Sequence, residues 1–121
     1  MAESRIGQAK FRKDLLKYWK TCSVTGLRVE FLLRASHIKP WSGASPTERL
    51  DSFNGLLSPN LDALFDKGLI SFNAEGQLLI SSRLEQNQYS ALGISVGMKL
   101  RRVNGAHSPY LAYHRENIFK S

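Results

Sequence analysis

The sequence has a single cysteine, Cys22, among its 121 residues. One cysteine cannot form an internal disulfide, and by itself it cannot build a zinc knuckle, so we expect a small buried residue near a helix end. No run approaches 18 apolar residues, which excludes a membrane-spanning helix. The N-terminal residues lack the apolar core of a secretory signal. These absences predict a cytoplasmic protein with no membrane partner.

Acidic residues are also scarce, and the charge is unevenly spread. Lysine and arginine total 17 against 10 acidic residues, which gives a formal net charge of +7. Residues 1–20 and 97–121 each carry a net +4, whereas residues 36–68 carry −1. Basic flanks around a slightly acidic centre favour a protein that holds a phosphate backbone on either side of a reaction centre. The alternative is a solvated cationic surface that keeps the protein soluble.

The length and the hydrophobic content of 42% are those of one globular domain, which we place over residues 1–121. Phe11, Leu15, Tyr18 and Trp19 recur at helical spacing and predict an N-terminal helix over 7–20. The other expected elements follow in chain order: a strand or hairpin arm over 28–38, a loop over 39–53 with one helical turn at 46–50, a turn at 54–55 entering a short strand, a helix opening at 58–59, a hairpin over 69–81, a short helix over 83–92, a basic strand over 98–103 and a terminal helix or arm over 109–119.

The helix that opens at Ser58-Pro59 has the clearest signals, because Ser is a favoured N-cap, Pro suits the first helical position and Gly68 ends the helix. Asp62 and Asp66 lie four residues apart and share one face. Two like charges at this spacing are mildly destabilising unless a cation compensates them. We therefore interpret the pair as a candidate cation site, although Asp66 pairing with an arginine or capping a neighbouring backbone stays open.

Six blocks of sequence resemble the HNH nucleases, the ββα-metal group, and more narrowly the bacterial HNH endonuclease domains of restriction-like proteins. That family reads RxGQxxFR, CxVTG, ASHIxPW, ERLDxxNGLLL, LDxLFDxGLISF and YHR in this order. The matching residues here are 5–12, 22–26, 35–41, 48–57, 61–72 and 113–115. The resemblance implies an α+β fold in which a ββα motif packs on an N-terminal helix and is extended by a C-terminal hairpin and helix.

The resemblance also implies a role for each matching position. His37 corresponds to the general base that takes a proton from the attacking water, a task suited to imidazole because its pKa lies near neutrality. Asn54 corresponds to the central Asn that holds the loop bearing the histidine. Asp62 occupies the third, metal-binding position, and Asp66 follows one turn later. Without the resemblance, His37 would be interpreted as structural and Asn54 as a turn residue.

Two positions depart from the general family pattern. Asp62 replaces the usual third histidine, and Ser36 stands where many relatives carry an Asp, Glu or His ligand; we keep Ser36 with the candidate metal site. Hard carboxylate ligands favour Mg²⁺ or Mn²⁺, with Zn²⁺ or Ni²⁺ as alternatives. The candidate nucleic-acid contacts are Arg12, Lys39, Lys67, Arg101, Arg102, His114 and Arg115.

The sequence therefore predicts a metal-dependent HNH endonuclease that hydrolyses phosphodiester bonds in DNA, with a role in restriction or defence. The main alternative is a DNA-binding module on a ββα scaffold with weak or no catalysis, which the Ser36 departure favours. A metal-stabilised interaction domain is a third hypothesis. A homodimer and a separate DNA-recognition domain, fused or acting in trans, both stay open.

Overall fold

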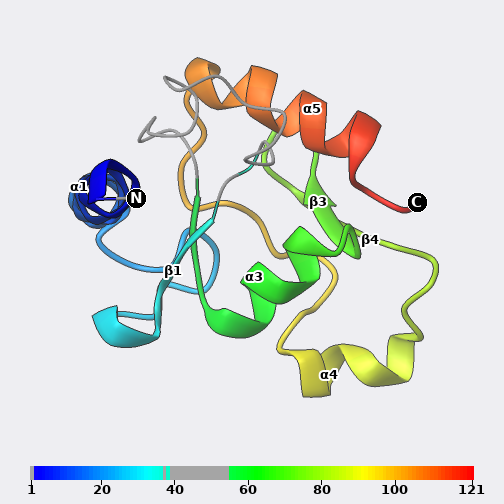
Figure 1. Cartoon of the computed structure of the whole chain (residues 1–121). Helices are drawn as coiled ribbons and strands as arrows, with labels where there is room; N and C mark the ends of the chain where they lie inside the picture. The colour runs from blue at the N-terminus through cyan, green and yellow to red at the C-terminus, as the bar shows by residue number, and fades with distance from the viewer. Residues whose placement is uncertain (1, 37, 39–54) are drawn as a thin grey trace.

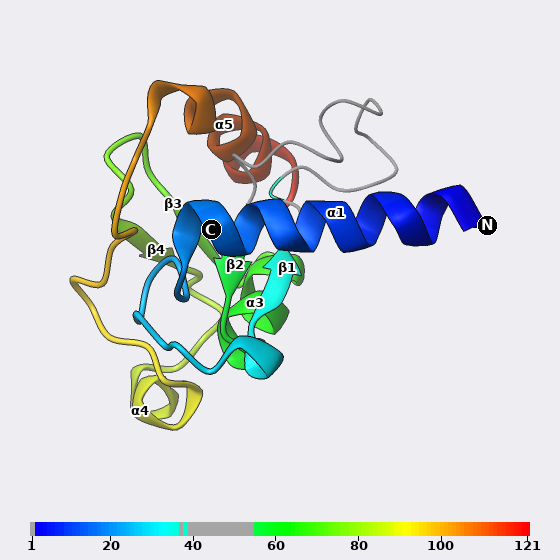
Figure 2. The same cartoon turned by 90° about the vertical axis from the view of Figure 1, so that its left-hand side faces the viewer.

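The computed structural model of the chain describes residues 2–36, 38 and 55–121. It contains helices and two small antiparallel sheets, which confirms the α+β class expected from the sequence. The longest helix, α1 (Ala2–Trp19), is seen end-on in Figure 1 and along its length in Figure 2. No described helix combines the length and hydropathy needed to cross a membrane.

The predicted N-terminal helix is confirmed, and it begins earlier than the sequence pattern indicates. Phe11, Leu15 and Trp19 are buried at 2%, 0% and 5% exposure, as their helical spacing requires. Tyr18 is partly buried, with its ring edge-on to Trp19 at a centroid distance of 5.1 Å. The buried face of α1 packs against the sheet formed by the next two strands.

The central unit is two strands followed by a helix, the predicted ββα order. Strand β1 (Arg34–Ser36) pairs antiparallel with β2 (Gly55–Leu57), and α3 (Pro59–Asp66) follows directly. All three residues of β2 are buried, since α1 covers one side of the sheet and α3 contacts β1. This order places the described part of the candidate site at the middle of the molecule.

The strand predicted over 28–38 is wrong in its first half. Residues Glu30–Leu32 form a 3-10 turn, η1, and only Arg34–Ser36 is a strand. The Arg12 guanidinium of α1 donates hydrogen bonds to the carbonyls of Glu30 and Leu33, each at 2.6 Å. These bonds hold the carbonyls toward α1, so the turn replaces an extended strand.

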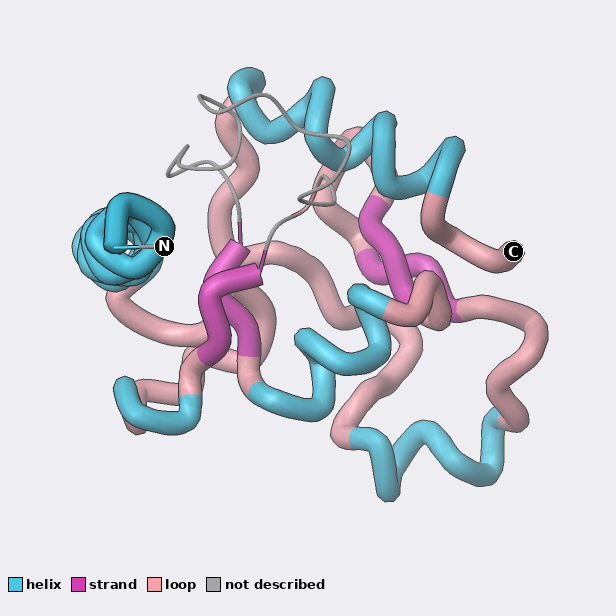
Figure 3. The backbone as a smooth tube through the Cα atoms, in the orientation of Figure 1, coloured by secondary structure: helices cyan, strands magenta, loops and turns pink. Residues whose placement is uncertain are grey.

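The C-terminal half supplies a second sheet and a covering helix. The predicted hairpin is confirmed as β3 (Ile70–Phe72) paired with β4 (Leu78–Ile80), and the terminal helix as α5 (Ser108–Asn117). Helix α3 contacts both β1 and β3, so it joins the two sheets, while α5 packs on β3 (Figure 3). The shorter turns and helices of this half are η3 (Gln86–Gln88), α4 (Tyr89–Leu92) and η4 (Gly105–His107).

Two predictions for this half are corrected. The helix expected over 83–92 is limited to η3 and α4, and the strand expected over 98–103 is only an isolated bridge between Lys99 and Gln77. Two residues after the bridge, the Arg101 N–H donates to the Ser23 carbonyl at 2.8 Å. The segment thus leaves the hairpin to meet the 22–26 turn, which ends the ladder.

Candidate active site

The paired strands β1 and β2 bring two distant parts of the motif together. Their register is Arg34 with Leu57, Ala35 with Leu56 and Ser36 with Gly55. Ser36 immediately precedes His37 in sequence, and Gly55 immediately follows Asn54. His37, Lys39 and Asn54 themselves lie outside the described residues, so their predicted roles stay predictions. The described strand ends next to His37 and Asn54 lie opposite each other in the sheet.

The turn at residues 22–26 braces β2 along the edge away from β1. The Ser23 hydroxyl donates to the Leu56 carbonyl at 2.8 Å and accepts from the Leu56 N–H at 3.1 Å, while the Ser23 N–H also donates to that carbonyl at 2.7 Å. Ser23 is fully buried. The side chain thus acts as an added ladder partner next to Gly55. Its only sequence signal is its place inside the CxVTG block.

Cys22 is buried, as the sequence predicts, and its thiol connects that same turn to α3. The sulfur accepts hydrogen bonds from the N–H groups of Thr25 and Ser58, both at 3.4 Å. Burial by itself raises the pKa of the Cys22 thiol, but hydrogen bonds from Thr25, Val24 and Ser58 outweigh it and lower the pKa. Because Ser58 precedes the first helical residue, Cys22 fixes where α3 begins.

Helix α3 directs Asp62 toward an open groove. Ser58 has the extended backbone of an N-cap and Pro59 takes the first helical position, as predicted, although no side-chain capping bond forms. Asp62 is half-buried in the first turn, where the helix dipole favours an anion. The groove has a volume of about 430 Å³, and its lining residues are Arg12, Phe31, Leu33, Arg34, Ala35 and Asp62. Two cationic side chains and one carboxylate therefore share it.

The structure separates Asp66 from this groove. Asp66 is the last residue of α3, is exposed, and is not one of the lining residues. Its charge instead acts on His114 of α5. Lys67, the C-cap of α3, is exposed and remains accessible to a phosphate.

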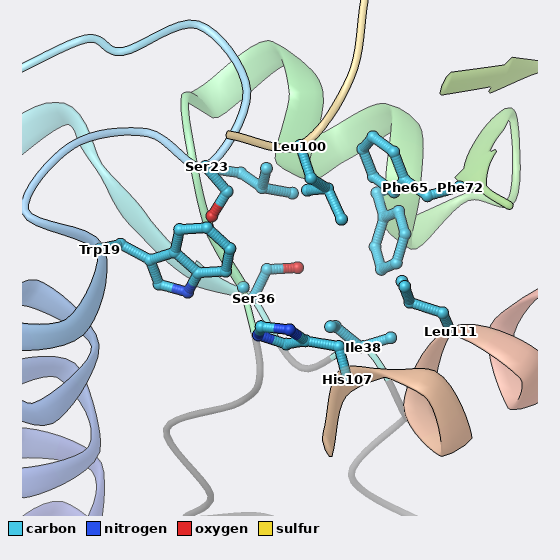
Figure 4. Close-up of a pocket in the computed structure, with 11 residues that line it drawn as sticks. Trp19, Ser23, Ser36, Ile38, Phe65, Phe72, Leu100, His107 and Leu111 are labelled. Carbon is cyan, nitrogen blue, oxygen red and sulfur yellow. The ribbon is translucent and has the colours of Figure 1, made fainter. Parts of the chain in front are cut away.

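Ser36 faces a different space from Asp62. Its side chain is 5% exposed and lines a small enclosed cavity of about 20 Å³, together with Trp19 and His107 (Figure 4). That cavity is lined mostly by core residues, and it shares no lining residue with the groove. The described structure therefore does not bring Ser36 and Asp62 together.

Four arginines predicted to contact DNA make hydrogen bonds inside the protein. Besides Arg12, Arg101 donates to the Thr21 hydroxyl, Arg102 donates to the Tyr18 carbonyl at 3.2 Å, and Arg115 donates to the Phe72 carbonyl at 2.9 Å. Arg102 also lies over the Tyr18 ring at 5.1 Å. A guanidinium has five N–H donors, so these bonds leave others for a phosphate. These four arginines therefore connect distant segments of the chain by hydrogen bonds and also carry positive charge.

His114 belongs to the core, which removes it from the DNA contacts. It is 2% exposed and stacks on Phe65 at a centroid distance of 3.6 Å. Its Nε2 donates to the Phe65 carbonyl and its Nδ1 accepts from the Ser71 hydroxyl, both at 2.8 Å. Burial lowers the pKa of His114 to about 4, against the opposite effects of the Phe65 carbonyl and Asp66. A neutral, enclosed imidazole does not bind phosphate.

The described side chains at the groove are suited to one kind of divalent metal site and not to another. Among residues 2–36, 38 and 55–121 there is no group of three or more His, Cys, Asp or Glu placed to hold a metal ion. Mg²⁺ in phosphate-processing sites is held by one or two carboxylates, with substrate phosphates and water completing its shell. A half-buried Asp62 on an open polar groove fits that pattern. It does not fit a closed, all-protein zinc site.

The described elements form a β-β-α unit with a carboxylate in the first turn of its helix, the arrangement that the sequence resemblance implies. Residues 22–73 match the family model described as HNH endonuclease, so the resemblance seen in the sequence is confirmed over this segment. The match spans both strands, α3 and β3. No curated protein matches the chain.

Proposed function

We propose that this chain is a metal-dependent endonuclease that hydrolyses phosphodiester bonds in DNA. The observation that carries the proposal is the ββα unit inside the segment that matches the HNH endonuclease family. In that unit the strand ends next to His37 and Asn54 are paired, and Asp62 lines the adjoining groove. Asp62 therefore lies on the helix of this unit, and His37 and Asn54 are next in sequence to its two strands.

In the proposed mechanism, His37 is the general base that removes a proton from the attacking water. Asn54 is a positioning residue that holds the loop so that the imidazole is aimed at the phosphate. The exposed Lys67, together with Lys39, binds the phosphates of the substrate strand, and the remaining donors of the tethered arginines extend the basic surface. A role in restriction or defence against foreign DNA is consistent with this chemistry.

Asp62 would hold the divalent cation, with Mg²⁺ or Mn²⁺ favoured by its hard carboxylate oxygens. Bound there, the cation supplies charge neutralisation at the scissile phosphate and at the leaving 3′ oxygen. The chain's own contribution is to fix the carboxylate. Cys22 and Ser23 do so indirectly, since they anchor the start of α3 and the strand before it.

Cleavage of supercoiled plasmid tests the proposal. Wild-type protein is incubated with Mg²⁺, Mn²⁺ or Ni²⁺ and with EDTA, beside His37→Ala at the same concentration. We expect metal-dependent nicking that falls by at least about 100-fold in the variant, the scale of losing a general base. Equal thermal unfolding midpoints for the two proteins establish that the variant is folded.

Two results contradict the proposal. Nicking that survives His37→Ala at the wild-type rate assigns the base to another group or the activity to a contaminant. Wild-type protein that binds DNA in a salt-sensitive manner, yet cleaves with none of the three metals, is the DNA-binding module of the alternative reading.

A further inference from the structure

An apolar turn is exposed beside the groove that Asp62 lines. In η1 and the residue before it, Phe31 is 86% exposed, Leu32 42% and Val29 36%. Phe31 is the most exposed of the large hydrophobic side chains described in the structure. A large apolar side chain in water costs free energy unless it has a partner, so a contiguous exposed set marks an interaction site.

The turn is held firmly in place. Arg12 donates to the carbonyls of Glu30 and Leu33 from α1, and the turn closes its own bonds from the Leu32 N–H to the Val29 carbonyl and from the Leu33 N–H to the Glu30 carbonyl, at 2.9 and 3.1 Å. Figure 2 shows this turn directly before β1. A braced turn presents the Phe31 ring with little ordering entropy left to lose on binding.

The chemistry around Phe31 matches a nucleotide. Phe31 and Asp62 line the same groove, so an aromatic residue and the proposed metal-binding carboxylate border one open space. Arg28 and Arg34 are exposed on either side of the turn, against one exposed carboxylate at Glu30. An aromatic side chain with flanking cations is the combination that binds a base by stacking and a phosphate by charge.

We propose that Phe31 stacks on a base of the DNA whose backbone lies along this groove, with Arg34 on an adjacent phosphate. This inference rests on the proposed function and adds a base-contacting residue to it. Aromatic stacking is tolerant of sequence because every base has a flat face. Phe31 therefore raises affinity and sets the position of the strand across Asp62 without specifying a base.

Binding is measured by fluorescence anisotropy of labelled single-stranded and duplex oligonucleotides in EDTA, where cleavage is prevented. We expect Phe31→Ala to weaken binding roughly tenfold with an unchanged salt dependence, and Phe31→Trp to retain the wild-type affinity. Arg34→Gln lowers the slope of log affinity against log salt by about one, since one phosphate contact is lost. Val96→Ala, at another exposed apolar side chain (80% exposed), is the matched control and leaves binding unchanged.

A 2-aminopurine base in the oligonucleotide reports stacking directly, and its fluorescence changes on binding wild type and Phe31→Trp but not Phe31→Ala. Phe31→Ala that binds as tightly as wild type, while wild type nicks plasmid, overturns this inference alone. Wild-type protein that binds neither oligonucleotide overturns the proposed function as well. A wild-type dimer in sedimentation equilibrium that Phe31→Ala converts to a monomer, with DNA binding unaltered, assigns the turn to contact between two copies of the chain.

Discussion

His114 illustrates, at the scale of one residue, how a polar side chain in a family motif serves packing. Its ring lies between Phe65 of α3, Ser71 of β3 and the rest of α5, and both nitrogens are hydrogen-bonded. The bonds require the neutral tautomer with hydrogen on Nε2, because the Phe65 carbonyl can only accept. His114 therefore fixes the end of α3 against α5.

This burial predicts a pH-dependent stability. The pKa of His114 is about 4 in the folded protein and near 6.5 when unfolded, so between these values the unfolded state binds more protons. Stability then falls as pH drops through this window and changes no further from this group below about 4. We expect a loss of about 2 kcal/mol between pH 7 and pH 5, measured by urea unfolding.

The control is His114→Gln, which keeps an amide donor and acceptor but does not titrate. Carboxylates that titrate near pH 5 affect both proteins alike, so the difference between the two stability curves isolates the imidazole. Identical slopes for wild type and His114→Gln between pH 7 and pH 5 would contradict the assigned tautomer and burial.

For the arginines, residue type and charge predict phosphate contacts but do not predict the hydrogen bonds that they make inside the protein. The sequence places Arg12, Arg101, Arg102 and Arg115 in basic flanks, and charge counting predicts phosphate contacts. Their hydrogen bonds to carbonyl and hydroxyl groups depend on which backbone atoms the fold brings near them, 18 to 84 residues away in sequence. The exposure of Phe31 is unexpected for a related reason, because a segment rich in Val, Phe, Leu and Ile with no helix cap before it favours a strand, whereas residues Glu30–Leu32 form an exposed turn.

At the scale of elements, local chemistry predicted the helix of the candidate site well. Ser58, Pro59 and Gly68 mark the ends of α3 within two residues of its observed bounds, since capping, a fixed φ and a left-handed terminator act locally. The hairpin after it was equally clear from its Gly turn. The strand expected over 98–103 failed, because a long-range hydrogen bond to Ser23 decides its path.

Gly68 is where the end of α3 meets the end of α5, and it predicts a sharp mutational effect. It has φ of +74°, and a Cβ added there would lie 2.1 Å from the Ile118 carbonyl oxygen. Its own carbonyl accepts the Lys120 N–H at 2.8 Å. We expect Gly68→Ala to lower the free energy of unfolding by roughly 3 kcal/mol or more, since backbone must move as well as adopt a strained φ. Chemical denaturation measures it.

Gly97 is the matched control. It also has a positive φ, +99°, but a Cβ there meets nothing within 4 Å among the described residues. Gly97→Ala carries the conformational cost alone, about 1 kcal/mol. Equal losses for the two variants would mean that the contact between Gly68 and the end of α5 has no energetic weight.

For the whole molecule, the structure shows where the unevenly distributed charges of the sequence lie. The basic ends of the chain lie on α1 and in the segment that contains α5, while β1, β2 and α3 of the ββα unit lie between them (Figure 1). Two of the flanking cations donate hydrogen bonds to carbonyls that adjoin this unit, Arg12 to Leu33 just before β1 and Arg115 to Phe72 of β3. The fold class and the resemblance to HNH endonucleases over residues 22–73 followed from sequence, whereas the separation of Asp62 from Ser36 and Asp66 required the tertiary structure.

The most direct test of this account compares two carboxylates one helical turn apart. Asp62 lines the groove beside β1, whereas Asp66 is exposed and acts on His114. We measure the plasmid nicking rate against Mg²⁺ and Mn²⁺ concentration for wild type, Asp62→Asn and Asp66→Asn. The account predicts at least about a 100-fold lower rate for Asp62→Asn, as expected when charge stabilisation is lost. It predicts a change within about threefold for Asp66→Asn, as for a surface substitution. Equal losses, or a larger loss for Asp66→Asn, would contradict the placement of the metal site in the groove.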